Sequence, residues 1–114
     1  MNEAAALADL REIAPQLGPL IYLDAEGGPV ASTVDDPDQL ASAIARLVEA
    51  ARALRPGSER GVERLHVTTG EGAVFAVSRS GRTLAALGPI DAAPALVFHD
   101  LRTTLDRLES DAPA

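Results

Sequence analysis

The chain has 114 residues, a formal net charge of −7 and no cysteine. This length suits one domain with a single hydrophobic core, and the lack of cysteine excludes disulfides, thiol nucleophiles and thiolate zinc sites. The negative charge disfavours binding to nucleic acid or anionic lipid. Aromatic residues make up only 3% of the chain, so alanine, leucine and valine must build its core.

The N-terminal residues have no basic stretch before an apolar one, and no segment approaches the ~20 apolar residues of a membrane span. We therefore expect a cytoplasmic protein with one domain, residues 1–114, without membrane insertion. All ten basic residues are arginine and alanine is abundant, which is typical of a high-GC bacterial genome.

The first third of the chain predicts a helix followed by a β-hairpin. The helical spacing of Leu10, Ile13 and Leu17 predicts a helix over residues 2–16, which Asn2 caps and the prolines at 15 and 19 end. Two β-prone runs follow, residues 20–23 and 29–34, joined by an Asp- and Gly-rich turn. The first run is apolar on both faces, as in a covered strand, and the second begins with proline, which suits a sheet edge.

A second helix is predicted over residues 37–54. Asp36 is its expected N-cap, Pro37 takes the first helical position, and Pro56-Gly57 ends it. Its apolar stripe covers about half of the circumference, whereas a helix on one sheet needs little more than 100°. Something besides the sheet should therefore cover part of this stripe, whose residues are Leu40, Ala41, Ala43, Ile44, Leu47, Val48, Ala50, Ala51 and Leu54.

The second half predicts a three-stranded meander and a last helix. Residues 62–69, 72–78 and 82–87 are β-prone and are joined by turns at Gly70-Glu71 and Ser80-Gly81; the middle run is apolar on both faces and is expected to be central. A helix over residues 92–108 follows, with Asp91 as its expected cap, and residues 109–114 form a frayed tail. The order α-β-β-α-β-β-β-α predicts an α/β (α+β) sandwich, a five-stranded antiparallel sheet with helices on both faces.

This order and the hairpin resemble the roadblock/dynein light chain superfamily, including its bacterial branch of small-GTPase regulators. In that family the first strand ends in Asp, passes a short Gly turn and returns through a small apolar strand, as residues 20–32 do here. The Ala-rich second helix and the Gly-turned meander also fit, so the resemblance covers about residues 7–108. The proline-rich stretch at residues 15–19 and the double glycine, Gly27-Gly28, depart from the usual pattern.

The resemblance implies a homodimer in which the third strands pair and the second helices pack together. It also implies a non-catalytic regulator or scaffold that binds a Ras-like small GTPase and carries no cofactor. The wide apolar stripe supports the dimer independently, because a monomer would leave part of it exposed. The residues expected in the dimer interface are Ala41, Ile44, Ala45, Val48, Arg52, Val62, Arg64, His66 and Thr68.

No residue pattern indicates catalysis or metal binding. His66 and His99 each lack a second ligand at metal-binding spacing, and the glycine turns neither lead into a helix nor precede lysine. The carboxylates of Asp24 and Glu26 are expected to face water on the hairpin, and the acidic residues at 35–38 are interpreted as helix caps. No serine has a nucleophile-elbow context. We therefore expect no catalytic, metal or cofactor site.

Two pairs of basic residues leave alternatives open. Arg79 and Arg82 flank a turn, where they either reach an acidic partner or, as we favour, belong to a solvated loop. Arg64 and His66 lie on a strand that is either a charged free edge or a dimer-pairing strand, and the resemblance favours pairing.

The alternative function is a small-ligand sensing module of profilin or PAS type, which the scarcity of aromatic residues disfavours. A small enzyme is the third possibility, although no catalytic group supports it.

Overall fold

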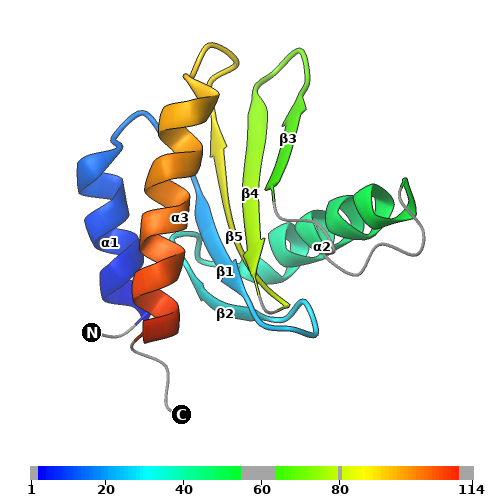
Figure 1. The fold of residues 1–114 in the computed structure, drawn as a ribbon, viewed down its shortest axis with the longest axis horizontal. Helices are drawn as coiled ribbons and strands as arrows, with labels where there is room; N and C mark the ends of the chain where they lie inside the picture. Colours follow the sequence, from blue (N-terminus) through cyan, green and yellow to red (C-terminus); the bar gives the residue numbers. More distant parts are fainter. Residues whose placement is uncertain (1–2, 55–63, 80, 111–114) are drawn as a thin grey trace.

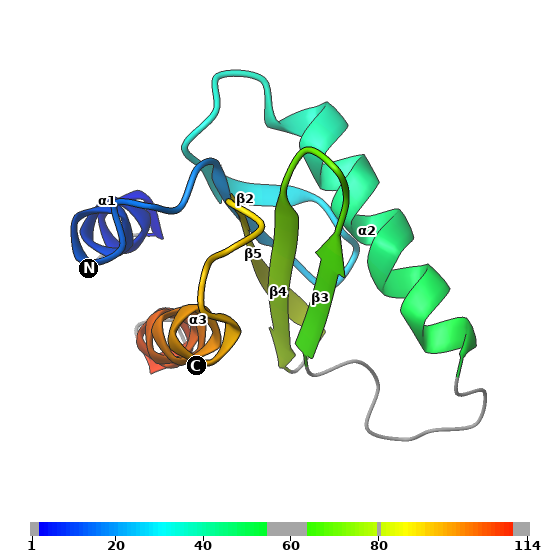
Figure 2. The ribbon, with the colours of Figure 1, turned by 90° about the horizontal axis from the view of Figure 1, so that it is seen from above.

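A computed structural model describes residues 3–54, 64–79 and 81–110 as three layers, with α1 and α3 on one face of a sheet and α2 on the other (Figures 1 and 2). The five strands form one antiparallel sheet in the order β2-β1-β5-β4-β3, which confirms the predicted fold class. The elements are α1 Glu3–Ile13, β1 Leu20–Leu23, β2 Pro29–Ser32, α2 Pro37–Ala53, β3 Arg64–Thr68, β4 Ala73–Arg79, β5 Arg82–Gly88 and α3 Pro94–Ser110.

The N-terminal hairpin and the C-terminal meander join through β1 and β5, which pair over the full length of β1. All four residues of β1 are buried, as its two apolar faces predicted, and β2 is an edge strand, as its proline indicated. The middle strand of the sheet is β5 and not β4, the strand expected to be central. Since β4 lies between β5 and the edge strand β3, it is still an interior strand.

The larger core lies between the sheet and the helices α1 and α3. Phe75 of β4 is fully buried there, beneath Val97 and Leu101 of α3 and beside Leu84 of β5. Because the side chains of a strand alternate between its faces, the other half of the sheet residues face α2. The residues of this second, smaller core are Ile21, Leu23, Ala41, Ile44, Val48, Ala76 and Ala85.

Helix α2 covers its face of the sheet only in part. It contacts β1 and β2, and its far end extends past the sheet (Figure 1). Leu40 and Leu47 on one flank of the helix are only half-buried, and Leu54, which follows it, is 82% exposed. A single helix therefore leaves the β3 side of this face uncovered.

Two local expectations about the helices are wrong. Helix α1 ends at Ile13, ahead of Pro15, so Ile13 is 63% exposed and does not join the buried stripe. Asp91 does not cap α3: the Val97 amide donates to the Ala93 carbonyl, which makes Ala93 the N-cap and Pro94 the first helical residue. The predicted β3–β4 turn at Gly70-Glu71 is confirmed, since the Thr69 amide donates to the Gly72 carbonyl across it.

Some expectations concern residues outside those described. The cap at Asn2, the helix stop at Pro56-Gly57, the strand start at Val62 and most of the C-terminal tail belong to this group. The other predicted boundaries differ from the observed ones by two residues or fewer at nearly every end. No helix within the described ranges is both long and apolar enough to cross a membrane.

Two leucines of α3 test the placement of the larger core. Leu101 is fully buried and Leu96, on the same helix, is 54% exposed. Leu101→Ala should lower the free energy of unfolding by about 2–5 kcal/mol, because it removes buried methyl groups and leaves a cavity. Leu96→Ala, the matched control, should change it by less than about 0.5 kcal/mol. Urea unfolding followed by circular dichroism measures both free energies. Equal losses in the two variants would show that the placement of α3 is wrong.

Candidate interaction surface

The uncovered part of the α2 face carries a group of half-buried and exposed apolar residues, which we call the edge surface. Leu40 and Leu47 of α2 pack against the smaller core together with Leu65 of β3 and Val74 of β4, and all four are only half-buried. Val67 of β3 points to the same face, since it pairs with Val74. The edge surface consists of Leu40, Leu47, Leu54, Leu65, Val67 and Val74.

The strand β3 borders the edge surface and ends the sheet. Within the described part of the chain it pairs with β4 alone, so the backbone N–H and C=O groups on its other side have no strand to bond. Such an edge is a template for pairing with another strand. The uncovered face and the open edge therefore lie next to each other, on the same side of the molecule (Figure 2).

The residues expected in the dimer interface do not lie on one surface of the chain. Ala41, Ile44 and Val48 are buried beneath α2 against the chain's own sheet, which leaves them no surface for a second copy. Ala45 is half-buried beside the β1–β2 turn. The exposed residues Arg64, His66 and Thr68 lie together on β3, on the face of α1 and α3. The side chain of Arg52 and all of Val62 lie outside the described residues.

The expected interface omitted the apolar residues of the edge surface. Leu40, Leu47 and Leu54 belong to the wide stripe of the second helix, but the sequence did not show which half of that stripe the sheet covers. Leu65 and Val67 carried a signal in their alternation with Arg64 and His66. The burial pattern of β3, in which only these two are half-buried, confirms that alternation.

Three of the chain's few aromatic and imidazole rings meet on the opposite face of β3 and β4. The His66 ring stacks on Phe75 with centroids 4.5 Å apart and an angle of 14° between planes. Phe98 of α3 stands edge-on to both rings, at 6.3 Å from His66 and 5.7 Å from Phe75. The Arg64 guanidinium carbon lies 5.7 Å from the centre of the Phe98 ring, within cation–π range.

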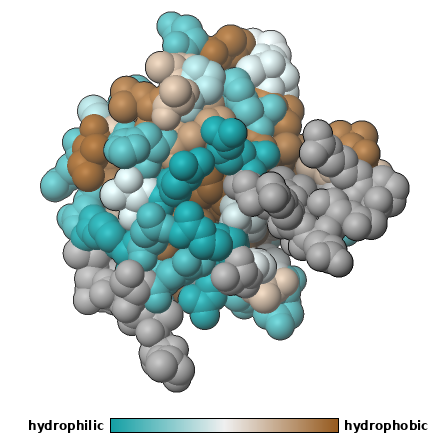
Figure 3. All heavy atoms as spheres, in the orientation of Figure 1, coloured by the Kyte–Doolittle hydropathy of each residue, from teal (hydrophilic) through white to brown (hydrophobic). Residues whose placement is uncertain are grey.

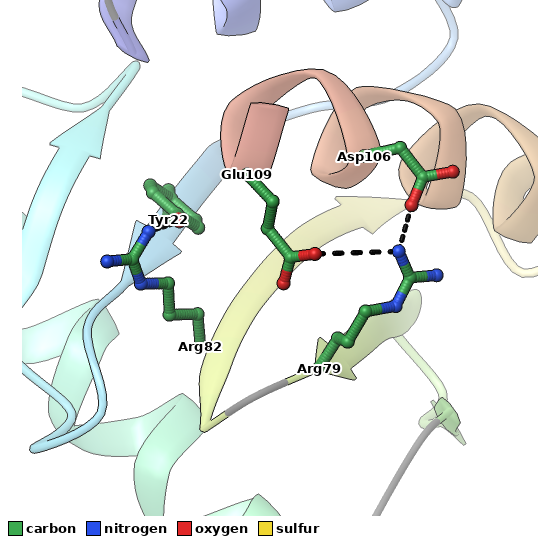
Figure 4. A network of polar contacts seen from close by, with 5 residues as sticks. All are labelled: Tyr22, Arg79, Arg82, Asp106 and Glu109. Atoms are coloured by element: carbon green, nitrogen blue, oxygen red, sulfur yellow. Dashed lines mark hydrogen bonds and ion pairs between the residues drawn. The ribbon is translucent and has the colours of Figure 1, made fainter. Parts of the chain in front are cut away.

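Arg79 is held by α3 and does not belong to a solvated loop (Figure 4). Its guanidinium forms an ion pair with Asp106 and a second with Glu109 at 3.6 Å. The hydrogen bond to Asp106 is the main reason that the pKa of Arg79 is raised. Arg82, on the other side of the turn, donates to the Tyr22 hydroxyl at 3.3 Å. Both arginines therefore find partners within their own chain.

The Asp24 carboxylate organises the β1–β2 turn. Its Oδ1 accepts hydrogen bonds from the amides of Glu26 and Gly28, both at 2.9 Å, and Gly27 between them has a positive φ of 83°. Asp24 is half-buried, so the expectation that it simply faces water is wrong, whereas Glu26 is exposed. Asp24 is thus a structural residue of the hairpin on which the family resemblance was based.

The described residues contain no group of three histidine, aspartate or glutamate side chains that could hold a metal ion. A hollow of about 440 Å³ lies where the α1–β1, β3–β4 and β5–α3 connections meet. Glycine, proline and aliphatic residues make up most of its wall, and Gln16, Thr69 and Glu71 supply its polar groups.

Solved structures resemble this fold over nearly the whole chain. A roadblock/LC7 domain from Streptomyces avermitilis matches with a TM-score of 0.83 and 19% identity, over 96% of this chain and 97% of that one. MglB from Myxococcus xanthus matches with a TM-score of 0.78 and 18% identity, over 94% and 91%. LokiProfilin2, in a complex with rabbit actin, matches with a TM-score of 0.69 and 16% identity, over 98% of this chain and 100% of that one.

No sequence family matches the chain, and no curated protein is detectably similar to it. At such low identity the structural matches show the fold alone. The chain has the roadblock fold that the order of elements and the hairpin predicted.

Replacing Asp24 tests its role in the turn. Asp24→Ala removes the acceptor of two backbone amides and should cost about 1–3 kcal/mol of unfolding free energy. Asp24→Asn keeps an oxygen at this position and should cost clearly less. Thermal unfolding of both variants measures the difference; an alanine variant as stable as the native chain would show that the glycines alone form the turn.

Proposed function

From its roadblock/LC7 fold, we propose that this chain is a cytoplasmic homodimer that regulates or scaffolds a Ras-like small GTPase without catalysing a reaction itself. The observation that carries the proposal is the edge surface beside the open strand β3. Both features require a partner, and both are found where the roadblock resemblance implies that two copies meet.

A two-fold axis perpendicular to the sheet satisfies both features in one assembly. The β3 strands of two copies then pair in antiparallel fashion, which extends the sheet and gives their outward backbone groups hydrogen-bond partners. The same axis keeps both α2 helices on one face of the joined sheet. There the half-buried leucines of α2 and the exposed Leu54 would cover each other and the uncovered side of β3 and β4.

This geometry replaces part of the interface expected from the sequence. In the proposed dimer, Ala41, Ile44 and Val48 stabilise the single chain, while Leu40, Leu47 and Leu54 contact the second copy. Arg64, His66 and Thr68 stay near the two-fold axis through their position on β3, on the face opposite α2.

The GTPase is proposed from the roadblock resemblance, and the chemistry of the chain favours action by binding. Arg79 and Arg82 are engaged by Asp106 and Tyr22 in their own chain, so neither is poised to enter another protein's active site. A regulator of this kind acts by selecting the hydrolysis-competent conformation of the GTPase.

The alternative is a small-ligand sensing module of profilin or PAS type, and the 440 Å³ hollow favours it. A ligand site in that hollow would use mainly backbone groups, Gln16 and Thr69. Capture of a GTPase from the same genome, with no small molecule bound to the purified chain, would favour the regulator.

Glutamate substitutions at two exposed leucines, one on each side of the sheet, test the dimer. Light scattering at micromolar concentration should give twice the 11.8 kDa mass of the chain. Leu54→Glu should yield a folded monomer, because it places a charge in the proposed interface without touching the core. Leu96→Glu, the same change at an exposed site on α3, should remain dimeric.

A clean monomer for the native chain would contradict the proposed assembly, and so would equal behaviour of the two glutamate variants. Val48→Asp supplies the contrast, because Val48 is buried within one copy and a carboxylate there should unfold the chain. Circular dichroism separates this unfolding from simple dissociation.

Single-turnover GTP hydrolysis tests the mode of action. A Ras-like GTPase from the same genome, loaded with GTP, should bind the dimer, and Arg64→Ala should change any stimulated rate by less than about tenfold. An arginine finger contributes roughly a thousandfold or more, so a loss of that size with binding intact would make Arg64 a catalytic residue. A lack of binding to every such GTPase would contradict the regulatory function.

A further inference from the structure

A basic surface lies on the face of the sheet opposite α2, in a chain whose net charge is −7. Arg64 and His66 of β3 are exposed there, over the buried rings of Phe75 and Phe98. Arg102 is also exposed and follows Phe98 by one turn, on the same side of α3. We call Arg64, His66 and Arg102 the basic surface.

The side chains of the basic surface have no acidic partner within the described part of the chain. None of the three makes an ion pair there, since the acidic residues further along that side of α3, Asp106 and Glu109, engage Arg79. Figure 1 shows β3 extending beyond α3, and Figure 3, in the same view, shows strongly hydrophilic residues on the surface beside α3. The face is therefore open to a ligand.

The buried rings hold the side chains of His66 and Arg64 in place. His66 stacks on Phe75 with one face of its ring, which leaves the other face free, and Arg64 lies against Phe98. Side chains held in this way lose less conformational entropy on binding than free surface arginines do. Arginine in particular can donate two parallel hydrogen bonds to one carboxylate.

The proposed homodimer, on which this step rests, would double the basic surface. Antiparallel strands related by the two-fold axis place residues of the same face opposite one another, so in a pair centred on His66 the residues Arg64, His66 and Thr68 of one copy meet the same set in the other. Like charges opposite each other destabilise a sheet. An anionic ligand lying along the axis would offset that repulsion.

We propose that the basic surface binds an acidic protein segment, a run of aspartate or glutamate side chains, across the two copies of β3. Carboxylates match the paired donors of Arg64 and Arg102, and a short extended segment would lie along the paired β3 strands. Nucleic acid is the less favoured polyanion, because a long phosphate chain would extend beyond the basic surface over the rest of a chain whose net charge is −7.

Fluorescence anisotropy with a labelled twelve-residue peptide of alternating glutamate and serine tests the proposal. The native dimer should bind this peptide, and should bind its glutamine-serine counterpart at least about tenfold more weakly. Arg64→Gln and Arg102→Gln should each weaken binding about fivefold. Arg46→Gln, the same change at an exposed arginine of α2, should leave the affinity within about twofold.

Failure of binding, an equal loss in Arg46→Gln, or tighter binding of a twelve-nucleotide oligouridylate would each overturn the proposal. The monomeric Leu54→Glu variant tests the binding site separately from the proposed dimer. This variant should bind the glutamate peptide at least about fivefold more weakly than the native chain, because it presents half of the surface. Native affinity in the monomer would restrict the site to a single copy, against the two-fold arrangement.

Discussion

The unequal covering of the sheet governs the rest of this structure. Two helices, α1 and α3, bury one face, where Phe75, Leu84 and Leu101 are fully enclosed. The other face has only α2, which lies over β1 and β2 and leaves Leu65 and Val74 half-buried. Because the sheet also ends at the unpaired side of β3, the uncovered face and the open edge coincide. The proposed second copy, related by a two-fold axis, would cover the face and pair the edge at once.

In the proposed dimer, the two faces of β3 would have different roles. Leu65 and Val67 point to the α2 face, where apolar burial stabilises an assembly. Arg64 and His66 point to the α3 face, where rings from β4 and α3 support them and water reaches them. One strand of five residues thus joins a surface suited to self-association with a surface suited to an anionic ligand. This separation follows directly from the two-residue period of a strand.

The order of elements could be predicted from the sequence because local signals fix it. The turn at Asp24–Gly28, the proline at the start of α2 and the alternation in β3 each depend on neighbouring residues, and each is found as predicted. The half of the α2 stripe that meets the sheet depends instead on how the helix crosses the strands, which no local pattern records. This is why Ala41 and Val48 were expected at an interface and are buried within one chain.

Long-range contacts account for the remaining differences. Arg79 and Asp106 are separated by 27 positions, and only the packing of α3 beside β4 brings them together. Ile13 fits the apolar spacing of α1, but the helix ends at this residue and its side chain is exposed instead of joining the core. The stacking of His66 on Phe75 likewise required the register of β3 against β4.

Hydrogen exchange of the β3 amides tests the central claim most directly. The amides that point away from β4 should be protected at a concentration where two copies associate, because β3 of the partner would accept their hydrogen bonds. Dilution below the dissociation constant should remove this protection, while the amides bonded to β4 keep theirs. Fast, concentration-independent exchange of the outward amides in the native chain would contradict pairing through β3.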